Sequence, residues 1–524
     1  MKKQTFLCGI FILTIGTLLA KFIGAIYRIP LTWLLGVQGL GIYQLVYPMF
    51  SLLLILSSTG APTAISAMVS QRIKVGKYLE ARKIFRISLI SLFVIGVIFA
   101  IFLFAMSDVL ANIQGNTLAR MPYMTIALAI PLVSILSAYR GYYQGCQNMV
   151  PTSLSQVVEQ LGKLVLGLIF ANMLLPYGIQ YGVVGAFLGV VGGEVLAVLT
   201  TIVYHRIIQK KHFSPSQITD DNIIPTRVLI VELLKRSTPI IIASMALPLL
   251  QVLDSFLVPN LLTMSGFTIE QSTVMWGIYS GMVTSIINMP IVLTLSIATS
   301  IVPEMSSVEH KLDLQKVQNS FLLTLNIALP SMLGILILAP QIIKFLYADT
   351  LSDIILDEFA LSTNLLLLGS ILILLTSIMQ IQNATLQSIN RSFVPLRNIM
   401  LAGILKVSLT ILLVVLADLS IYGVVLSNIC FYLTITILNF VYMRTKLHVR
   451  NTWGNTLPSF CSSCVMGVVL LMSVFAFANF SLYLRLPIQI LLGVLVYFAT
   501  LLVLSRDVSL VQFLSKRTKR VYKK

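Results

Sequence analysis

The sequence Tyr181-Gly182-Val183-Val184 returns as Tyr422-Gly423-Val424-Val425. A second phrase, QGCQNMVP at residues 144–151, returns loosely as QSINRSFVP at residues 387–395. Both pairs are about 240 residues apart, which indicates a duplicated unit of that length. Each unit holds six predicted membrane spans, an even number, so both units enter a membrane in the same sense. Parallel repeats of this kind are typical of transporters with two lobes around a central site.

The composition predicts a membrane protein. Of the 524 residues, 57% are hydrophobic and 10% are charged, and the mean hydropathy is +0.94. Because a spanning helix needs about 20 mostly apolar residues, we expect fourteen spans, the first of them a retained helix rather than a signal peptide. They are predicted at residues 6–27, 42–70, 84–106, 119–139, 152–175, 181–204, 239–262, 276–301, 319–347, 359–388, 398–417, 421–442, 457–479 and 484–505.

The predicted fold class is an all-α integral membrane protein of two six-helix lobes in parallel pseudo-repeat, followed by a two-helix C-terminal hairpin. The expected parts are an N-lobe (1–210), a cytoplasmic linker (211–238), a C-lobe (239–443), helices 13 and 14 (457–505) and a basic cytoplasmic tail (506–524).

The net charge of +18 is distributed by the positive-inside rule rather than as a nucleic-acid-binding surface. With fourteen spans, the basic clusters at 72–86, 206–236 and 444–450 and the tail at 516–524 all fall on one side, and the loops on the other side are mainly acidic. We therefore expect both termini in the cytoplasm, the tail against anionic lipid headgroups, and no nucleic-acid partner.

Charged residues inside predicted spans are the main candidates for function, because each costs about 2.5–3.5 kcal/mol or more at the bilayer centre. The basic candidates are Lys21, Arg28, Lys163 and Lys406, and the acidic ones are Glu159, Glu194 and Asp254. Lys163 follows Pro151, and Lys406 follows Pro395, at nearly the same spacing. The duplication thus predicts a lysine from each lobe lining a central, cationic cavity that suits an anionic head group.

Structural roles remain open for the same residues. Glu159 and Lys163 are four residues apart and could pair along one helix face. Lys21 and Arg28 could extend to the membrane surface, and Asp254 could bond a neighbouring helix.

Proline and glycine predict interruptions in three spans. The first span is expected to end at Arg28-Ile29-Pro30, with an irregular link through Gly36, Gly39 and Gly41 before the second span begins. Gly60-Ala61-Pro62 and the prolines of Met289-Pro290 and Val302-Pro303 are expected to break the second and eighth spans. Such breaks favour a site between the lobes, although ordinary proline kinks are an alternative.

No cofactor or metal is predicted. Cys461 and Cys464 form a CxxC pair, but with only His448 near in sequence they fall short of about four zinc ligands.

Several motifs resemble a known family. They are Lys3-Gln4-Thr5-Phe6-Leu7, Tyr27-Arg28-Ile29-Pro30, Gly39-Leu40-Gly41-Ile42-Tyr43, Pro62-Thr63-Ala64-Ile65-Ser66, Arg140-Gly141-Tyr142-Tyr143-Gln144-Gly145, Asn148-Met149, Ser155-Gln156-Val157-Val158-Glu159-Gln160, Pro176-Tyr177-Gly178-Ile179 and Asp254-Ser255. Together they resemble the stage V sporulation protein B family, which is similar to the lipid II flippases of the multidrug and oligosaccharidyl-lipid exporter superfamily.

This resemblance implies alternating access and translocation of an undecaprenyl-pyrophosphate-linked glycan across the bacterial cytoplasmic membrane. The expected partners are that substrate, membrane lipids and a coupling ion. Lys21 and Arg28 best match the basic cavity residues of the lipid II flippases.

Three other functions remain open. An ion-coupled drug exporter of the same fold would use Asp254 or Glu194 as its coupling carboxylate. A membrane glycosyltransferase is disfavoured because the short outer loops lack catalytic polar residues, so we expect no enzyme. A scaffold without transport is the third alternative.

Overall fold

The computed structural model describes residues 6–212, 225–306, 314–348, 350–351, 357–389, 391–447 and 456–504. All regular elements in these ranges are helices. The predicted basic tail at 506–524 and the middle of the predicted linker, residues 213–224, lie outside the described residues.

Helices α1–α8 form one bundle, the N-terminal bundle. Its elements are α1 (Phe6–Leu54), the π-helix η1 (Ile55–Thr59), α2 (Gly60–Lys74), α3 (Tyr78–Ala105), α4 (Ser107–Ile113), η2 (Thr117–Ala119), α5 (Arg120–Ala127), α6 (Ala129–Gly145), α7 (Val150–Leu174), η3 (Leu175–Tyr177) and α8 (Ile179–His212).

The C-terminal bundle is α9–α16, and α17 and α18 follow it. The elements are α9 (Thr226–Met264), α10 (Ile269–Trp276), the π-helix η5 (Gly277–Val283), α11 (Thr284–Ser306), α12 (Leu314–Tyr347), α13 (Glu358–Gly369), α14 (Ile371–Ser388), α15 (Phe393–Ile411), the π-helix η6 (Leu412–Leu416), α16 (Ser420–Lys446), α17 (Leu457–Ala476) and α18 (Leu482–Leu504).

Thirteen helical runs in the described residues are long and apolar enough to span a membrane. The first, Ile12–Lys74, has 63 residues. Straight, it would be about 95 Å long, whereas a bilayer with its headgroups measures about 40–45 Å. This run therefore contains the first two predicted spans, which brings the total to the predicted fourteen. The chain is a multi-pass membrane protein.

The first run folds back at Gly36, whose φ of 67° and ψ of 179° interrupt the helix. Ser153 at the start of α7 donates to the Ile12 carbonyl, and Val69 packs at Gly145 at the end of α6. Because α6 ends where α7 begins, residues 12 and 69 lie at the same end of the molecule. This backbone conformation is essentially restricted to glycine.

The predicted end of the first span at Pro30 is wrong, because α1 is helical through Pro30. The break itself falls within the predicted link, at Gly36, and the neighbouring residues of α1 up to Gly41 are helical. The π-helix η1 precedes Gly60 and places one irregularity where the sequence predicts it. The predicted breaks at Pro290 and Pro303 are also wrong, since α11 is helical from Thr284 to Ser306. Proline inside a membrane helix is tolerated where neighbouring groups compensate for the missing donor.

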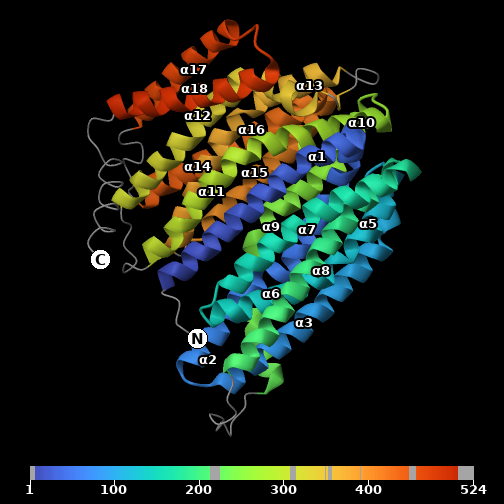
Figure 1. Cartoon of the computed structure of the whole chain (residues 1–524), viewed down its shortest axis with the longest axis vertical. Coiled ribbons are helices and arrows are strands. Elements are labelled where there is room, and N and C mark those ends of the chain that lie inside the picture. Colours follow the sequence, from blue (N-terminus) through green and yellow to red (C-terminus); the bar gives the residue numbers. More distant parts are fainter. Residues whose placement is uncertain are drawn as a thin grey trace.

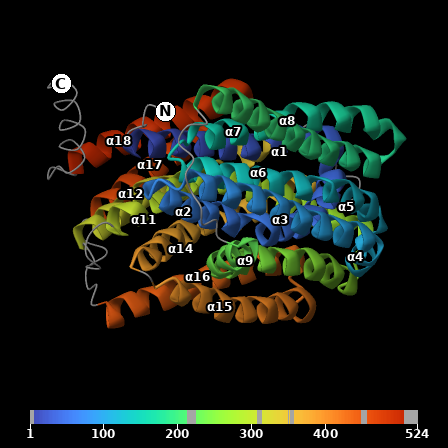
Figure 2. The same ribbon diagram turned by 90° about the horizontal axis from the view of Figure 1, so that it is seen from below.

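The two bundles lie side by side, and α1 contacts both of them. Figure 2 shows α7 and α8 on the opposite side of the molecule from α15 and α16. The C-terminal helices α17 and α18 pack on each other and on α12, at the edge of the molecule (Figure 1).

Helix α9 begins at Thr226, so the last part of the predicted linker is helical. Its first turns bury Leu229 and Leu233 against Ile65 of α2 and Phe85 of α3. Further along, Leu250 packs with α15 and α16 of the C-terminal bundle. The apolar spacing on α9 thus attaches one helix to both bundles.

Candidate functional site

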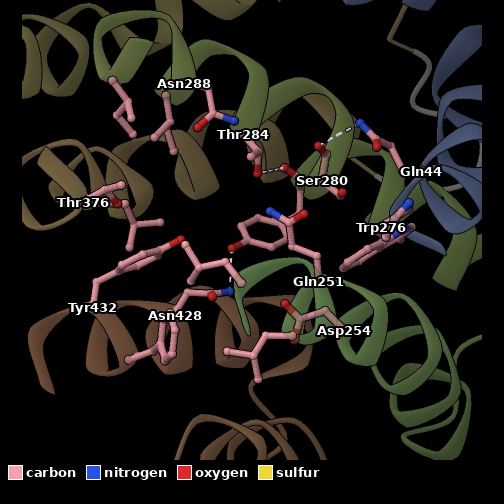
Figure 3. Close-up of a pocket in the computed structure, with 18 of the residues that line it drawn as sticks. Gln44, Gln251, Asp254, Trp276, Ser280, Thr284, Asn288, Thr376, Asn428 and Tyr432 are labelled. Atoms are coloured by element: carbon pink, nitrogen blue, oxygen red, sulfur yellow. Dashed lines mark hydrogen bonds between the residues drawn. The ribbon is translucent and has the colours of Figure 1, made fainter. Parts of the chain in front are cut away.

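A cavity of about 210 Å³ lies where α1 meets the C-terminal bundle. Ten of its residues are labelled in Figure 3. The lining consists of Arg28, Gln44, Tyr47, Pro48, Leu247, Leu250, Gln251, Asp254, Trp276, Tyr279, Ser280, Thr284, Ile287, Asn288, Ile291, Leu372, Thr376, Lys406, Asn428, Phe431 and Tyr432.

The reversal at Gly36 divides α1 into a first arm before Gly36 and a second arm after it. Each arm carries one polar residue that reaches the cavity. On the first arm, Arg28 Nη1 donates to Ser285 Oγ at 3.2 Å. On the second arm, Gln44 Nε2 donates to the Ser280 carbonyl of η5 at 3.1 Å (Figure 3). A half-buried cation and a buried amide therefore reach the cavity from one sequence segment.

Glycine lets α1 pack closely against α10 and η5 beside the cavity. A Cβ at Gly41 would lie 2.2 Å from the Thr273 carbonyl oxygen, and one at Gly277 would lie 2.4 Å from the Val37 carbonyl oxygen. Both distances are too short for a side chain, so the backbone contact requires glycine at these positions.

Lys406 and Asp254 form an ion pair in the cavity wall. Lys406 Nζ lies 2.5 Å from Asp254 Oδ2, and only 4% of Lys406 is exposed. The same ammonium lies 5.4 Å from the centre of the Phe431 ring. Both predicted residues thus line the cavity, but their charges offset each other.

Lys163 does not line the cavity but contacts a residue that does. Its ammonium lies 5.1 Å from the centre of the Tyr27 ring and 5.0 Å from that of Tyr47, which lines the cavity. Lys163 and Lys406 occupy similar places in the repeat, on α7 and α15, but the predicted symmetry of their roles is not found.

Glu159 pairs with a residue that sequence reasoning did not select as a site residue. Arg140 Nη2 lies 2.8 Å from Glu159 Oε2, and Arg140 Nε donates to Ser155 Oγ at 3.0 Å. The alternative of a Glu159–Lys163 pair along α7 is wrong, because Arg140 from α6 takes the carboxylate and Lys163 turns toward the tyrosines.

Glu194 completes this separate cluster in the N-terminal bundle. It is 4% exposed, and its Oε2 has no hydrogen-bond partner among the described residues. A Cβ at the adjacent Gly193 would lie 2.6 Å from the Glu159 carbonyl oxygen, so α7 and α8 touch here. Neither Glu159 nor Glu194 lines the cavity.

Lys21 also lies outside the cavity, although it was predicted to line it. Its side chain is exposed and makes no ion pair with any carboxylate that the structure describes. It lies about two helical turns from Arg28 along α1, which accounts for its separation from the site.

The sequence prediction missed the uncharged polar residues of the cavity. Asn428 donates to the Tyr279 hydroxyl at 2.8 Å. Gln251 and Asn288 bond no other described side chain, and the indole N–H of Trp276, 3% exposed, has no partner in the described part of the chain. Amides within apolar spans are a detectable signal, since burying them unpaired costs free energy.

Polar contacts join the two bundles at the end of the molecule that contains α4 and α10. Asn116 Nδ2 donates to Thr273 Oγ1 at 2.9 Å, Gln114 Nε2 donates to Ser255 Oγ at 3.3 Å, and Asn260 bonds the Ile113 carbonyl. We call this uncharged contact between the bundles the α10-end seam.

At the opposite end, ion pairs join α2 and α3 to α9, and we call this contact the α2-end seam. Arg72 of α2 lies 2.8 Å from Glu80 of α3 and 3.7 Å from Glu232 of α9. Arg236 pairs with Glu232 at 2.7 Å and donates to Gln71 at 3.1 Å. The two bundles therefore meet on both sides of the cavity.

No group of three or more histidine, cysteine, aspartate or glutamate side chains in the described residues could hold a metal.

Comparison with known proteins identifies the family. The model of the family described as polysaccharide biosynthesis protein matches residues 6–309, more than half of the chain. Stage V sporulation protein B of Bacillus subtilis (strain 168) is 27% identical over 444 residues, covering 84% of this chain and 83% of that protein. Lipid II flippase MurJ of the same organism is 26% identical over 458 residues, covering 83% and 82%.

Solved structures share the fold. An inward-facing multidrug resistance MATE family transporter of the MOP superfamily superposes with a TM-score of 0.68 at 18% identity, covering 84% of this chain and 96% of that one. Lipid II flippase MurJ in an inward closed conformation gives 0.66 at 14% identity, covering 95% and 99%. The predicted resemblance and fold class are confirmed, and the chain belongs to the polysaccharide biosynthesis protein family.

Proposed function

We propose that this protein is a flippase that moves a polyprenyl-pyrophosphate-linked cell-wall or polysaccharide precursor to the outer leaflet of the bacterial cytoplasmic membrane by alternating access. The observation that carries the proposal is Arg28, a guanidinium that lines a central cavity and bonds a hydroxyl group rather than a carboxylate.

An arginine at membrane depth is costly unless its charge is offset. Arg28 makes no ion pair within the described part of the chain, whereas Lys406 is neutralised by Asp254 and Glu159 by Arg140. Guanidinium binds phosphate oxygens through two parallel hydrogen bonds. The unpaired charge therefore favours a phosphate-bearing head group in the cavity.

The seams support alternating access, because each joins the two bundles by contacts that can separate. The α2 end carries a dense set of basic residues, among them Arg72, Lys74 and Arg86. The positive-inside rule then places the α2 end and both termini in the cytoplasm. Opening the α2-end seam would admit the head group, and opening the α10-end seam would release it.

The second candidate is an ion-coupled exporter of small molecules. The MATE transporters that share this fold and the carboxylate of Asp254 in the cavity wall favour it. An organic cation would have to bind beside Arg28 and Lys406, so the charge of the lining favours the flippase.

Proteoliposomes distinguish these candidates. Purified protein is reconstituted with a fluorescent polyprenyl-pyrophosphoryl sugar, and its transfer between leaflets is followed by a membrane-impermeant quencher. We expect transfer by the wild type, loss of transfer in Arg28→Gln, and near-normal transfer in the control Lys21→Gln. Export of cationic dyes without transfer of the lipid would instead support the exporter.

A further inference from the structure

The charged residues of the cavity lining are Arg28, Lys406 and Asp254, which together carry a net charge of +1. A sugar-linked polyprenyl pyrophosphate is a diester and carries two negative charges. The cavity as it stands therefore falls one positive charge short of its proposed substrate. Since charge in a desolvated site must be compensated, binding needs one further positive charge.

We propose that Asp254 takes up one proton when the pyrophosphate head group binds and replaces Asp254 as the ion-pair partner of Lys406. This inference rests on the proposed function and deepens it. Protonation of Asp254 raises the lining from +1 to +2, which matches the diester. It also frees the ammonium of Lys406 to donate to phosphate oxygens.

The geometry indicates that the net charge of the lining can change at the Lys406–Asp254 ion pair. Lys406 and Asp254 belong to different helices, α15 and α9, and both face the same cavity as Arg28. Only 4% of Lys406 is exposed, so its ammonium has little room to move. It can bind a phosphate oxygen only if it leaves Asp254 or contacts both groups at once. A buried carboxylate that loses its cation is strongly destabilised unless it is neutralised.

Among the described residues, Lys406 is the one cation at ion-pair distance from Asp254. The ionisable groups that face it are Lys406 from α15, Tyr279 from η5, Tyr432 from α16 and, across the cavity, Arg28 and Tyr47 from α1. The charged residues of α2 and α3 contact α9 at Glu232, several turns away. A proton is thus the smallest group that can balance Asp254.

The cycle balances without any covalent step. One proton from water binds to the Asp254 carboxylate as the head group enters, and the Asp254–Lys406 pair re-forms and releases it as the head group leaves. By linkage, affinity falls as pH rises by up to about tenfold per pH unit, provided the diester itself stays fully ionised.

Isothermal titration calorimetry of the full chain in lipid nanodiscs tests the proposal. The probe is farnesyl-pyrophosphoryl-N-acetylglucosamine, titrated in two buffers with different enthalpies of ionisation, so that the difference in heat counts protons. We expect about one proton taken up per ligand bound. Asp254→Asn should bind at least as tightly, with no proton uptake and no pH dependence.

Two controls keep the result decisive. Glu194→Gln removes a buried carboxyl that lies outside the cavity, and it should leave the proton count unchanged. Infrared difference spectra of the wild type should show a protonated carboxyl band on ligand binding, a readout that holds even if Asp254→Asn does not fold.

Binding without proton uptake, or proton uptake that survives in Asp254→Asn, overturns the inference and leaves the flippase proposal intact. Failure of the wild type to bind the probe overturns both.

Discussion

The ammonium of Lys163 lies 5.0 Å from the centre of the Tyr47 ring, and Tyr47 lines the central cavity. Tyr27 holds the same ammonium from the first arm of α1, at 5.1 Å. Lys163 therefore acts on the cavity through an aromatic ring, whereas Lys406 faces it directly.

Replacing Lys163 by Met should lower the transfer rate by about two- to thirtyfold, because a cation–π contact contributes about 0.5–2 kcal/mol to the position of the ring. Tyr47→Phe keeps the ring and should retain most activity, and Tyr47→Leu should resemble Lys163→Met. If Lys163→Met abolishes transfer as completely as Arg28→Gln does, Lys163 binds the head group directly. Proteoliposome transfer rates decide between these outcomes.

Arg28→Lys should keep partial activity, and Arg28→Gln should reduce substrate affinity by about 10- to 100-fold. Hydrogen bonds to a charged group are worth about 1.5–3 kcal/mol, and lysine keeps the charge but not the bidentate geometry. Calorimetric affinities for the farnesyl-linked probe measure the effect. Equal affinity in wild type and Arg28→Gln would remove Arg28 from the site.

Breaking the Arg140–Glu159 pair should destabilise the N-terminal bundle. Either Arg140→Gln or Glu159→Gln is expected to cost about 1–3 kcal/mol, since the remaining half-buried partner loses its charge-assisted hydrogen bond. The double variant should cost less than the two single variants added together. Thermal unfolding in detergent gives these values. A coupling energy of similar size between Glu159 and Lys163 would contradict the pairing of Glu159 with Arg140.

Gly41→Ala should weaken the α10-end seam. The new Cβ would lie 2.2 Å from a backbone oxygen of Thr273, which cannot give way cheaply. We expect a loss of about 1–3 kcal/mol in stability, with reduced transfer. The control is Gly334→Ala on α12, where no atom lies within 4 Å of the added Cβ; helix propensity makes that change neutral or favourable by up to about 1 kcal/mol. Unchanged unfolding of Gly41→Ala would show that α1 and α10 are less tightly packed.

A reversible cross-link across the α2-end seam should lock the cavity. Gln71→Cys and Arg236→Cys, combined in a background without the native cysteines, place thiols on α2 and α9, where the native side chains share a hydrogen bond of 3.1 Å. Because that bond joins the ends of two long side chains rather than their Cβ atoms, a bis-methanethiosulfonate reagent bridges the thiols instead of a direct disulfide. Cross-linking should stop transfer, and reduction should restore it. A pair within one bundle, Asn364→Cys with Tyr422→Cys, serves as the control and should keep its transfer rate after the same treatment. Continued transfer by the cross-linked Gln71–Arg236 variant would contradict alternating access at this seam.

The sequence predicted the architecture well because the duplication and the apolar spans are strong, local signals. The first reversal was predicted in the right segment but not at one residue, since proline at 30 looked like a terminator but was accommodated by the surrounding helices. The break, Gly36, is one of the three glycines predicted for the link, and composition does not reveal which of them adopts the required backbone conformation.

The site was predicted in part. Arg28, Asp254 and Lys406 line one cavity, as predicted from the position of these charged residues inside apolar spans. Lys21, Lys163, Glu159 and Glu194 do not line it, because helix rotation decides which face each residue occupies, and a single sequence leaves that rotation unspecified. The pairing of Glu159 with Arg140 joins α7 to α6 and could not be read from spacing along one helix.

The most direct test of the flippase account is the accessibility of labelled lipid II at the outer leaflet of cells depleted of this protein and its paralogues. The account predicts that accessibility collapses on depletion and is restored by the wild type and by Lys21→Gln, but not by Arg28→Gln. Accessibility that stays unchanged on depletion would contradict lipid II as the cargo, and equal rescue by Arg28→Gln would contradict the proposed site.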